Sequence, residues 1–327
     1  MTFPILMLAM LLAATMGFAI QRGATCTVAA VDEWVNKRSL KRLASMFEAS
    51  LWVAGGLLIA NAFHVLGAMP AGYALTWFAL LGGALLGIGA FINQACVFGA
   101  IARLGSGEWA YVATPVGYYA GCRSVEWLLP HNATVPLTTP SPVFQAGPVI
   151  LVLVLALMFL RVGVPLYELR RAAPGESPVS FFTRLRVLLT ARLWTPHAAT
   201  GVIGVTFLFL LLLMGAWAYT DVLAELARGM TANVVARVAL LVALFAGAMF
   251  GGWTAGRFKP VRLSAAELAR CFVGGVLMGW GSLMIPGSND GLILLGMPLL
   301  WPYAWAAFLA MCVSIGAAMI GVRTFRK

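Results

Sequence analysis

The chain repeats the stretch Gly83-Ala-Leu-Leu-Gly-Ile-Gly-Ala-Phe-Ile-Asn-Gln-Ala-Cys-Val-Phe-Gly99 as Gly275-Val-Leu-Met-Gly-Trp-Gly-Ser-Leu-Met-Ile-Pro-Gly-Ser-Asn-Asp-Gly291, 192 residues later. At this offset four glycines coincide, and so do a tryptophan and a tyrosine further along. The residues Gly83, Gly87, Gly89, Gly99, Trp109 and Tyr111 fall on Gly275, Gly279, Gly281, Gly291, Trp301 and Tyr303. Cys96 falls on Ser288. Six identities at one constant offset predict an internal duplication.

The composition places both copies in a membrane. Of the 327 residues, 61% are hydrophobic and only 10% are charged, whereas an ordinary soluble domain has about 25% charged residues. The mean hydropathy is +0.92. A soluble fold cannot bury this much apolar surface, so we expect an all-α polytopic membrane protein. Soluble enzyme folds and disordered chains are excluded.

Nine apolar stretches are long enough to cross a bilayer, which predicts about nine transmembrane helices. They are 3–20, 46–66, 73–91, 108–128, 143–161, 196–219, 231–253, 267–284 and 301–321. Because the first 21 residues contain no Lys or Arg, we expect a retained first helix rather than a cleaved signal peptide.

The basic residues predict the orientation. With the N-terminus outside, 18 Lys and Arg residues fall in the inner segments and only Arg228 falls in an outer one. Cytoplasmic loops of membrane proteins are enriched in Lys and Arg, so this distribution predicts an outer N-terminus and a cytoplasmic C-terminus. It also accounts for the net charge of +11 without a nucleic-acid partner.

In this orientation the two copies are inverted. The stretch 73–91 runs from outside to inside, whereas 267–284 runs from inside to outside. Each is followed by an apolar segment too short to cross, about 95–104 and about 288–297, which we interpret as a re-entrant half-helix. Inverted repeats with broken helices are a transporter architecture. The predicted units are a first transmembrane repeat at 1–142, a linker helix and cytoplasmic amphipathic loop at 143–195, and a second, inverted transmembrane repeat at 196–327.

The predicted linker contains an amphipathic segment at 180–193. Its apolar side chains share one helical face, and its arginines avoid that face. The apolar residues are Phe181, Phe182, Leu185, Leu188 and Leu189. We expect a helix on the inner membrane surface that links the two halves.

Polar residues gather where the glycine-rich spans are interrupted. They are Gln21, Arg22, Thr25 and Cys26 in the first motif, Asn93, Gln94 and Cys96 in the second, and Ser288, Asn289 and Asp290 in the third. Half-helices direct free backbone N–H groups and a positive dipole end toward the membrane centre, which suits an anion. Taken alone, the glycines would be explained by helix packing and Arg22 by anchoring at the inner face. With the duplication and the interruptions, we expect a substrate site.

The five cysteines include no CxxC pair, which argues against a zinc site or a disulfide framework. We expect no metal and no cofactor. Cys122, Cys271 and Cys312 are interpreted as packing residues. Cys96 differs because its counterpart Ser288 is also a small polar residue at the start of a predicted half-helix.

Three motifs carry a family resemblance. They are Gly17-Phe-Ala-Ile-Gln-Arg-Gly-Ala-Thr-Cys26, Gly87-Ile-Gly-Ala-Phe-Ile-Asn-Gln-Ala-Cys96 and Gly279-Trp-Gly-Ser-Leu-Met-Ile-Pro-Gly-Ser288. They resemble the core motifs of the YeeE/YedE (TsuA-like) membrane family, over nearly the whole chain. The resemblance implies a transporter of thiosulfate or another sulfur compound, in which a cysteine of each motif hands the anion along by hydrogen bonds. Cys26 and Cys96 match two of these cysteines, and Ser288 departs from the third, which leaves the substrate open.

We therefore expect an inner-membrane permease, not an enzyme, for a small sulfur-containing anion. Its partners would be this anion and the lipid bilayer. The candidate substrate-binding residues are Cys26, Cys96, Ser288, Gln21, Arg22, Asn93, Gln94 and Asn289. Two alternatives stay open. One is a membrane sulfur relay that carries sulfur covalently on a cysteine to a cytosolic sulfur-acceptor protein, and the other is a non-transporting partner of a larger complex.

Asp290 has two interpretations. A carboxylate in the first turn of a half-helix caps the N-terminal dipole. Alternatively, it titrates and couples proton entry to anion entry, because an ionisable residue at membrane depth is functional by default. Coupling or trapping would be useful, since moving a dianion inward against a potential of about 100 mV costs about 4.6 kcal/mol.

Overall fold

Helices make up nearly all of the structure. The computed structural model describes residues 3–67, 69–125, 134–145, 147–170, 183, 190–230 and 233–325. Within these ranges the only β-structure is an isolated bridge between Tyr73 and Pro136. The helices are α1 (Phe3–Gly23), α2 (Thr27–Lys37), α3 (Lys41–Ala62), α4 (Trp77–Asn93), α5 (Val97–Gly105), η1 (Trp109–Val112), α6 (Ala113–Val125), α7 (Pro142–Gln145), α8 (Pro148–Arg170), α10 (Pro196–Met214), α11 (Tyr219–Ala227), α12 (Val234–Thr254), α13 (Ala265–Met284), α14 (Asn289–Gly291), η2 (Leu292–Gly296) and α15 (Pro302–Phe325). The predicted all-α fold is confirmed.

The same order of helices occurs twice. Adding the offset of 192 to the bounds of α1, α2 and α3 gives 195–215, 219–229 and 233–254, which are close to the positions of α10, α11 and α12. In the same way α4, α5 and α6 correspond to α13, to α14 with η2, and to α15. The contacts repeat as well, because α1 packs against α12 as α10 packs against α3, and α6 packs against α13 as α15 packs against α4. The duplication in the sequence is therefore matched by the order and the packing of the helices.

Glycines bring α4 and α13 into backbone contact. A Cβ added to Gly82 would lie 2.7 Å from the carbonyl oxygen of Gly281, and one added to Gly89 would lie 2.7 Å from that of Gly274. Residue numbers rise on one helix as they fall on the other, so the two helices are antiparallel. An inverted duplication requires this opposite sense of corresponding helices. The contact supports the inversion, which itself stays a prediction.

The described chain contains six helices long and apolar enough to cross a membrane, or up to seven if α13 and the α14–η2 segment form one bent span. The chain is therefore a multi-pass membrane protein. Two of the predicted spans are shorter in the structure: α6 has 13 residues, and the apolar part of α8 is Val149–Gly163. A straight span needs about 20 residues, so the number of nine stays a prediction.

Two helix breaks lie where the sequence predicts them. α4 ends at Asn93 because Gln94 adopts a left-handed conformation with φ 60°, and α5 starts three residues further on. α13 ends at Met284, and α14 with η2 is bent by 49° relative to it. The interval Trp77–Gly105 has 29 residues, which is enough for one broken span. The breaks are confirmed, whereas a re-entrant path of the short helices stays a prediction.

Two short helices, α2 and α11, were not predicted. The region between the stretches 3–20 and 46–66 was predicted to be an inner segment without a helix of its own. In the structure α2 forms there, directly after the first motif. Its Asp32, Glu33 and Lys37 mask the apolar positions in a hydropathy reading. The offset of 192 places α2 on α11, so a prediction of either helix would have indicated the other.

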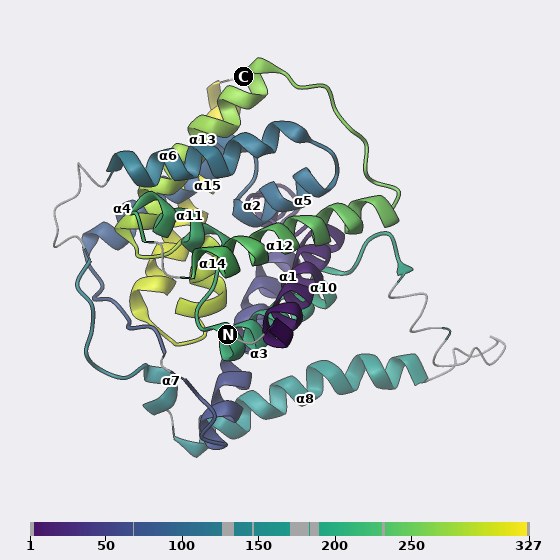
Figure 1. The fold of residues 1–327 in the computed structure, drawn as a ribbon, viewed down its shortest axis with the longest axis vertical. Helices are drawn as coiled ribbons and strands as arrows, with labels where there is room; N and C mark the ends of the chain where they lie inside the picture. Colours follow the sequence, from purple (N-terminus) through teal and green to yellow (C-terminus); the bar gives the residue numbers. More distant parts are fainter. Residues whose placement is uncertain are drawn as a thin grey trace.

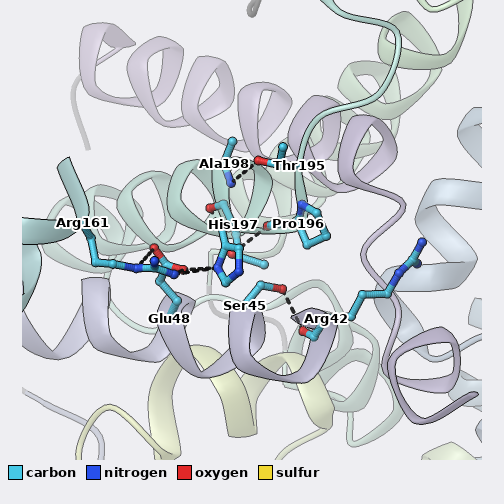
Figure 2. A network of polar contacts seen from close by, with 9 residues as sticks. Arg42, Ser45, Glu48, Arg161, Thr195, Pro196, His197 and Ala198 are labelled. Atoms are coloured by element: carbon cyan, nitrogen blue, oxygen red, sulfur yellow. Dashed lines mark hydrogen bonds and ion pairs between the residues drawn. The ribbon is translucent and has the colours of Figure 1, made fainter. Parts of the chain in front are cut away.

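α8 lies at the edge of the molecule, beside α3 (Figure 1). Its Arg161 donates from Nε to Glu48 Oε1 of α3 at 3.1 Å, and Arg161 Nη2 and His197 of α10 both contact Glu48 Oε2 (Figure 2). Glu48 is only 9% exposed. This cluster therefore joins the predicted first repeat, the linker and the second repeat. The amphipathic helix predicted at 180–193 lies largely outside the described residues.

The glycine contact predicts the effect of one added methyl group. Gly89→Ala should lower the free energy of unfolding by about 1–3 kcal/mol, because its Cβ would overlap the backbone of α13. The measurement is the thermal unfolding temperature of the purified protein in detergent. Gly321→Ala is the matched control, because a Cβ there meets nothing within 4 Å. Equal unfolding temperatures for the two variants would contradict the close approach of α4 and α13.

Candidate functional site

Four short helical segments begin at one place in the interior. The residues that immediately precede their first turns are Cys26 for α2, Cys96 for α5, Ala218 for α11 and Ser288 for α14. α5 is in contact with both α2 and α14, and α14 is in contact with α11. The two thiols and the hydroxyl that sequence analysis selected therefore stand at equivalent positions, as N-cap residues of helices that meet.

Two hydrogen bonds cross from one half of the chain to the other. Asn289 Nδ2 donates to Thr27 Oγ1 at 3.4 Å, and the Tyr219 hydroxyl donates to the carbonyl oxygen of Val97 at 3.3 Å. The offset of 192 places Thr27 on Tyr219 and Val97 on Asn289. The same two positions of the duplication are therefore hydrogen-bonded twice. In one bond the first half supplies Thr27 and the second half Asn289; in the other the second half supplies Tyr219 and the first half Val97. All four side chains are buried.

The thiols of Cys26 and Cys96 lie near each other, because Cys96 Sγ contacts the residue that follows Cys26. The backbone N–H of Thr27 also donates to Cys96 Sγ, at an N–S distance of 3.1 Å. A Cβ on Gly99 would lie 2.6 Å from Cys26 Sγ, so only glycine at this position leaves room for the thiol. The first turns of α2 and α5 thus hold the two sulfur atoms together.

The corresponding place in the second half carries oxygen atoms. Asp290 Oδ1 accepts from Thr220 Oγ1 at 2.6 Å and from the backbone N–H of Gly291 at 3.0 Å. These bonds fit the interpretation of Asp290 as a cap that also ties α14 to α11. In the described structure, the Ser288 hydroxyl has no hydrogen-bond partner, and neither does Asp290 Oδ2.

The electrostatics of this meeting point favour a polar ligand. None of the four helix starts has a side-chain cap from its N-cap residue, so positive dipole ends face the interior. Several buried oxygen atoms also lack a partner among the described residues: Thr25 Oγ1, Ser288 Oγ, Asn289 Oδ1 and Asp290 Oδ2. Buried polar atoms are nearly always paired, so these atoms mark places for water or a ligand.

A cavity of about 480 Å³ reaches the first thiol. We call it the Arg-lined cavity, after the side chains that share its wall. Its polar lining comprises Gln21, Cys26, Asp32, Arg42, Gln94, Arg103, Ser106, Glu108 and Arg257. Cys26 is 9% exposed, whereas Cys96 and Ser288 have no exposed surface and do not line the cavity. The cavity therefore reaches Cys26 alone among the three N-cap residues with a thiol or hydroxyl.

The other predicted site residues divide into two groups. Gln21 and Gln94 line the Arg-lined cavity, and Gln21 Nε2 donates to Ser106 Oγ at 3.3 Å. Arg22 does not line it. Its guanidinium bonds the carbonyl oxygen of Ala191 and, at 2.8 Å, Thr254 Oγ1, which is the contact pattern of a structural anchor.

Asn93 supports the helix break. Its Nδ2 donates to the carbonyl oxygen of Ala95 at 2.7 Å, and its Oδ1 accepts from Thr114 Oγ1 at 3.0 Å. The Tyr111 hydroxyl donates to its backbone carbonyl at 3.2 Å. The nitrogen and the oxygen of the Asn93 side-chain amide are thus both bonded to the protein. The residue therefore helps to position the start of α5.

Three polar residues of the meeting point were not predicted: Thr27, Tyr219 and Thr220. Tyr219 and Thr220 belong to the unpredicted α11, and Thr27 to the unpredicted α2. The signal for two of them was present, because Thr27 directly follows the motif ending at Cys26 and Tyr219 occupies the same position in the duplication. No three His, Cys, Asp or Glu side chains of the described chain are placed so that they could hold a metal ion.

Comparison with known proteins gives one match that covers most of the chain. The profile of the sulphur transport family, the YeeE/YedE family, matches residues 22–318. No curated protein is similar enough to the chain to count as a match. The matched region includes both halves of the duplication and all four short helices. The chain therefore belongs to the sulphur transport family, and it is a multi-pass membrane transporter of sulfur compounds.

Proposed function

We propose that the protein is an inner-membrane permease for a small sulfur-containing anion of the thiosulfate type. The anion passes between two inverted repeats and is handed from Cys26 to Cys96 and Ser288, or in the opposite order. The observation that carries this proposal is the meeting of four helix starts, none of which is capped by the side chain of its own N-cap residue. Three of these N-cap residues have a thiol or a hydroxyl.

The chemistry of these groups suits the substrate. Thiosulfate carries hard oxygens and a soft terminal sulfur, and a thiol is a polarizable donor that matches the latter. The free N–H groups and dipole ends replace part of the water that a dianion loses on leaving solution. Short contacts between Cys26, Cys96 and Thr27 keep these groups within reach of one another.

The membrane placement follows from charge. The Arg-lined cavity contains Arg42, Arg103 and Arg257, which the positive-inside rule assigns to the cytoplasmic side. The N-terminus is then outside and the C-terminus cytoplasmic. In this arrangement the cavity opens inward and reaches Cys26, whereas Cys96 and Ser288 are fully buried and do not line it. The units 1–142, 143–195 and 196–327 are the two repeats and their linker.

Uptake of labelled thiosulfate tests the function directly. Cells that produce the protein should accumulate the label faster than otherwise identical cells without it. Equal uptake would reject a thiosulfate permease and favour a non-transporting role.

A covalent sulfur relay is the second candidate, and one observation favours it. Arginines share the cavity with Cys26, and nearby cations favour the reactive thiolate. In a relay, the Cys26 thiolate attacks the terminal sulfur of thiosulfate, the S–S bond of thiosulfate breaks, and sulfite leaves with the electron pair. The sulfur would then pass to a cytosolic acceptor protein. Label that stays on the denatured protein and is released by a reductant would support the relay over the permease.

Removing the buried thiol should stop transport. We expect Cys96→Ala to abolish thiosulfate uptake at normal expression. Alanine has no group that could donate to the anion, and it also removes the Sγ that accepts from the Thr27 N–H. Cys96→Ser should keep part of the activity, since it retains a donor. Cys312→Ala is the control and should transport normally, because that thiol lies on α15 outside the meeting point. Wild-type uptake by Cys96→Ala would remove Cys96 from the path.

Position 288 should affect selectivity. We expect Ser288→Cys to raise thiosulfate uptake, or the preference for thiosulfate over sulfate, because a soft thiol replaces a hydroxyl that favours harder acceptors. The measurement is the initial uptake rate of labelled thiosulfate with sulfate as competitor. Unchanged selectivity would mean that this side chain does not contact the anion.

Asp290 separates capping from proton coupling. If the carboxylate titrates during transport, Asp290→Asn should make the initial uptake rate independent of external pH. If it is only a cap, the pH profile should match that of the wild type and the loss of stability should stay near 1 kcal/mol, because Asn caps about as well as Asp. Uptake is measured across external pH, with the thermal unfolding temperature recorded in parallel.

A further inference from the structure

We infer that the Arg-lined cavity contains a second, weaker oxyanion site built around Arg257, where the anion pauses after leaving Cys26. This inference rests on the proposed function and extends it to the release step. Both residues line the same cavity, so an anion that leaves Cys26 on this side enters a space whose wall includes Arg257.

Two of the three arginines in the cavity already have partners. Arg42 Nε lies 3.0 Å from Glu33 Oε2, and its Nη1 donates to the carbonyl oxygen of Ala24 at 3.4 Å. Arg103 Nη1 lies 2.9 Å from Glu108 Oε2. These arginines contribute positive charge to the wall, and each of them already has a carboxylate partner on the protein.

Arg257 differs from them. Its Nη1 is buried and has no hydrogen-bond partner in the described structure. The residue stands in the turn after α12, where its backbone N–H donates to the carbonyl oxygen of Gly252 at 2.9 Å. A buried guanidinium nitrogen without an acceptor is unfavourable unless a ligand or water supplies one. The planar guanidinium fits the oxygens of a tetrahedral oxyanion, which it binds through two N–H groups.

The acidic groups of the cavity set the strength of this site. Asp32 and Glu108 also line it, and Asp32 Oδ1 accepts from Asn36 Nδ2. Three arginines against two carboxylates leave a formal excess of one positive charge on the lining. A site of low net charge binds an oxyanion weakly, and weak binding is what a release site requires, because an anion held too tightly would not leave.

The test measures how well sulfate protects Cys26 from alkylation. Inverted membrane vesicles expose the predicted cytoplasmic side to N-ethylmaleimide, and modification of the Cys26 peptide is followed by mass spectrometry. Sulfate is the probe because it does not react with maleimide, and chloride at equal ionic strength is the salt control. In the wild type, sulfate should slow the alkylation of Cys26.

The variants assign the effect to one side chain. Arg257→Gln should raise the sulfate concentration for half-protection by about tenfold, as expected for loss of a charge-assisted hydrogen bond. Arg257→Lys should lie between this variant and the wild type, and it serves if Arg257→Gln fails to fold. Lys259→Gln is the matched control: it removes the same charge from the same loop, but its exposed side chain does not line the cavity.

Three outcomes would overturn the site: no protection in the wild type, equal half-protection in the wild type and both Arg257 variants, or an equal shift in Lys259→Gln. The last outcome would assign the effect to the general charge of the inner face. Thiosulfate uptake by the wild type is scored separately. Uptake together with Arg257-independent protection rejects the site and keeps the proposed function, whereas Arg257-dependent protection without uptake rejects the permease and keeps the site.

Discussion

The structure depends on how a broken helix is tolerated inside a membrane. Every break leaves backbone N–H groups without hydrogen-bond acceptors, and inside a bilayer little water is present to accept these bonds. This chain brings four helix starts together, so that the unpaired groups face one another and a small set of polar side chains instead of lipid. Thr27, Tyr219 and Asn289 bond across the halves and hold the arrangement closed. A place built in this way is polar and buried, and the starts of its helices are suited to holding a small polar ligand.

The two copies have diverged in chemistry while keeping their geometry. Cys96 corresponds to Ser288, and Cys26 corresponds to Ala218, so both thiols of the meeting point belong to the first copy. The second copy supplies a hydroxyl, an amide and the buried carboxylate of Asp290. The cavity reaches only the thiol side. The duplicated scaffold thus presents thiols from one copy and oxygen-bearing groups from the other.

Much of the fold could be predicted from the sequence, because its signals are global. The apolar fraction and the glycine spacing indicated helices in a membrane, and the duplicated motif located the breaks before α5 and α14. α2 and α11 escaped detection since their charged residues lower the local hydropathy below that of a span. The candidate site, too, could be predicted only where the sequence carries a motif. Positions marked by the motifs, such as Cys26 and Cys96, do lie together, whereas the anchoring contacts of Arg22 and the supporting bonds of Asn93 depend on partners far away in the sequence.

The antiparallel contact between α4 and α13 constrains how the protein can move. These helices touch through main-chain atoms at glycines, with side chains such as Met278 and Leu86 beside the contacts. Separating the helices would lose these close main-chain contacts. Rotation or sliding about the contact preserves it. If the two halves alternate between faces, α4 and α13 are therefore suited to act as the fixed pivot, and the short helices α2, α5, α11 and α14 are the parts left free to shift around it.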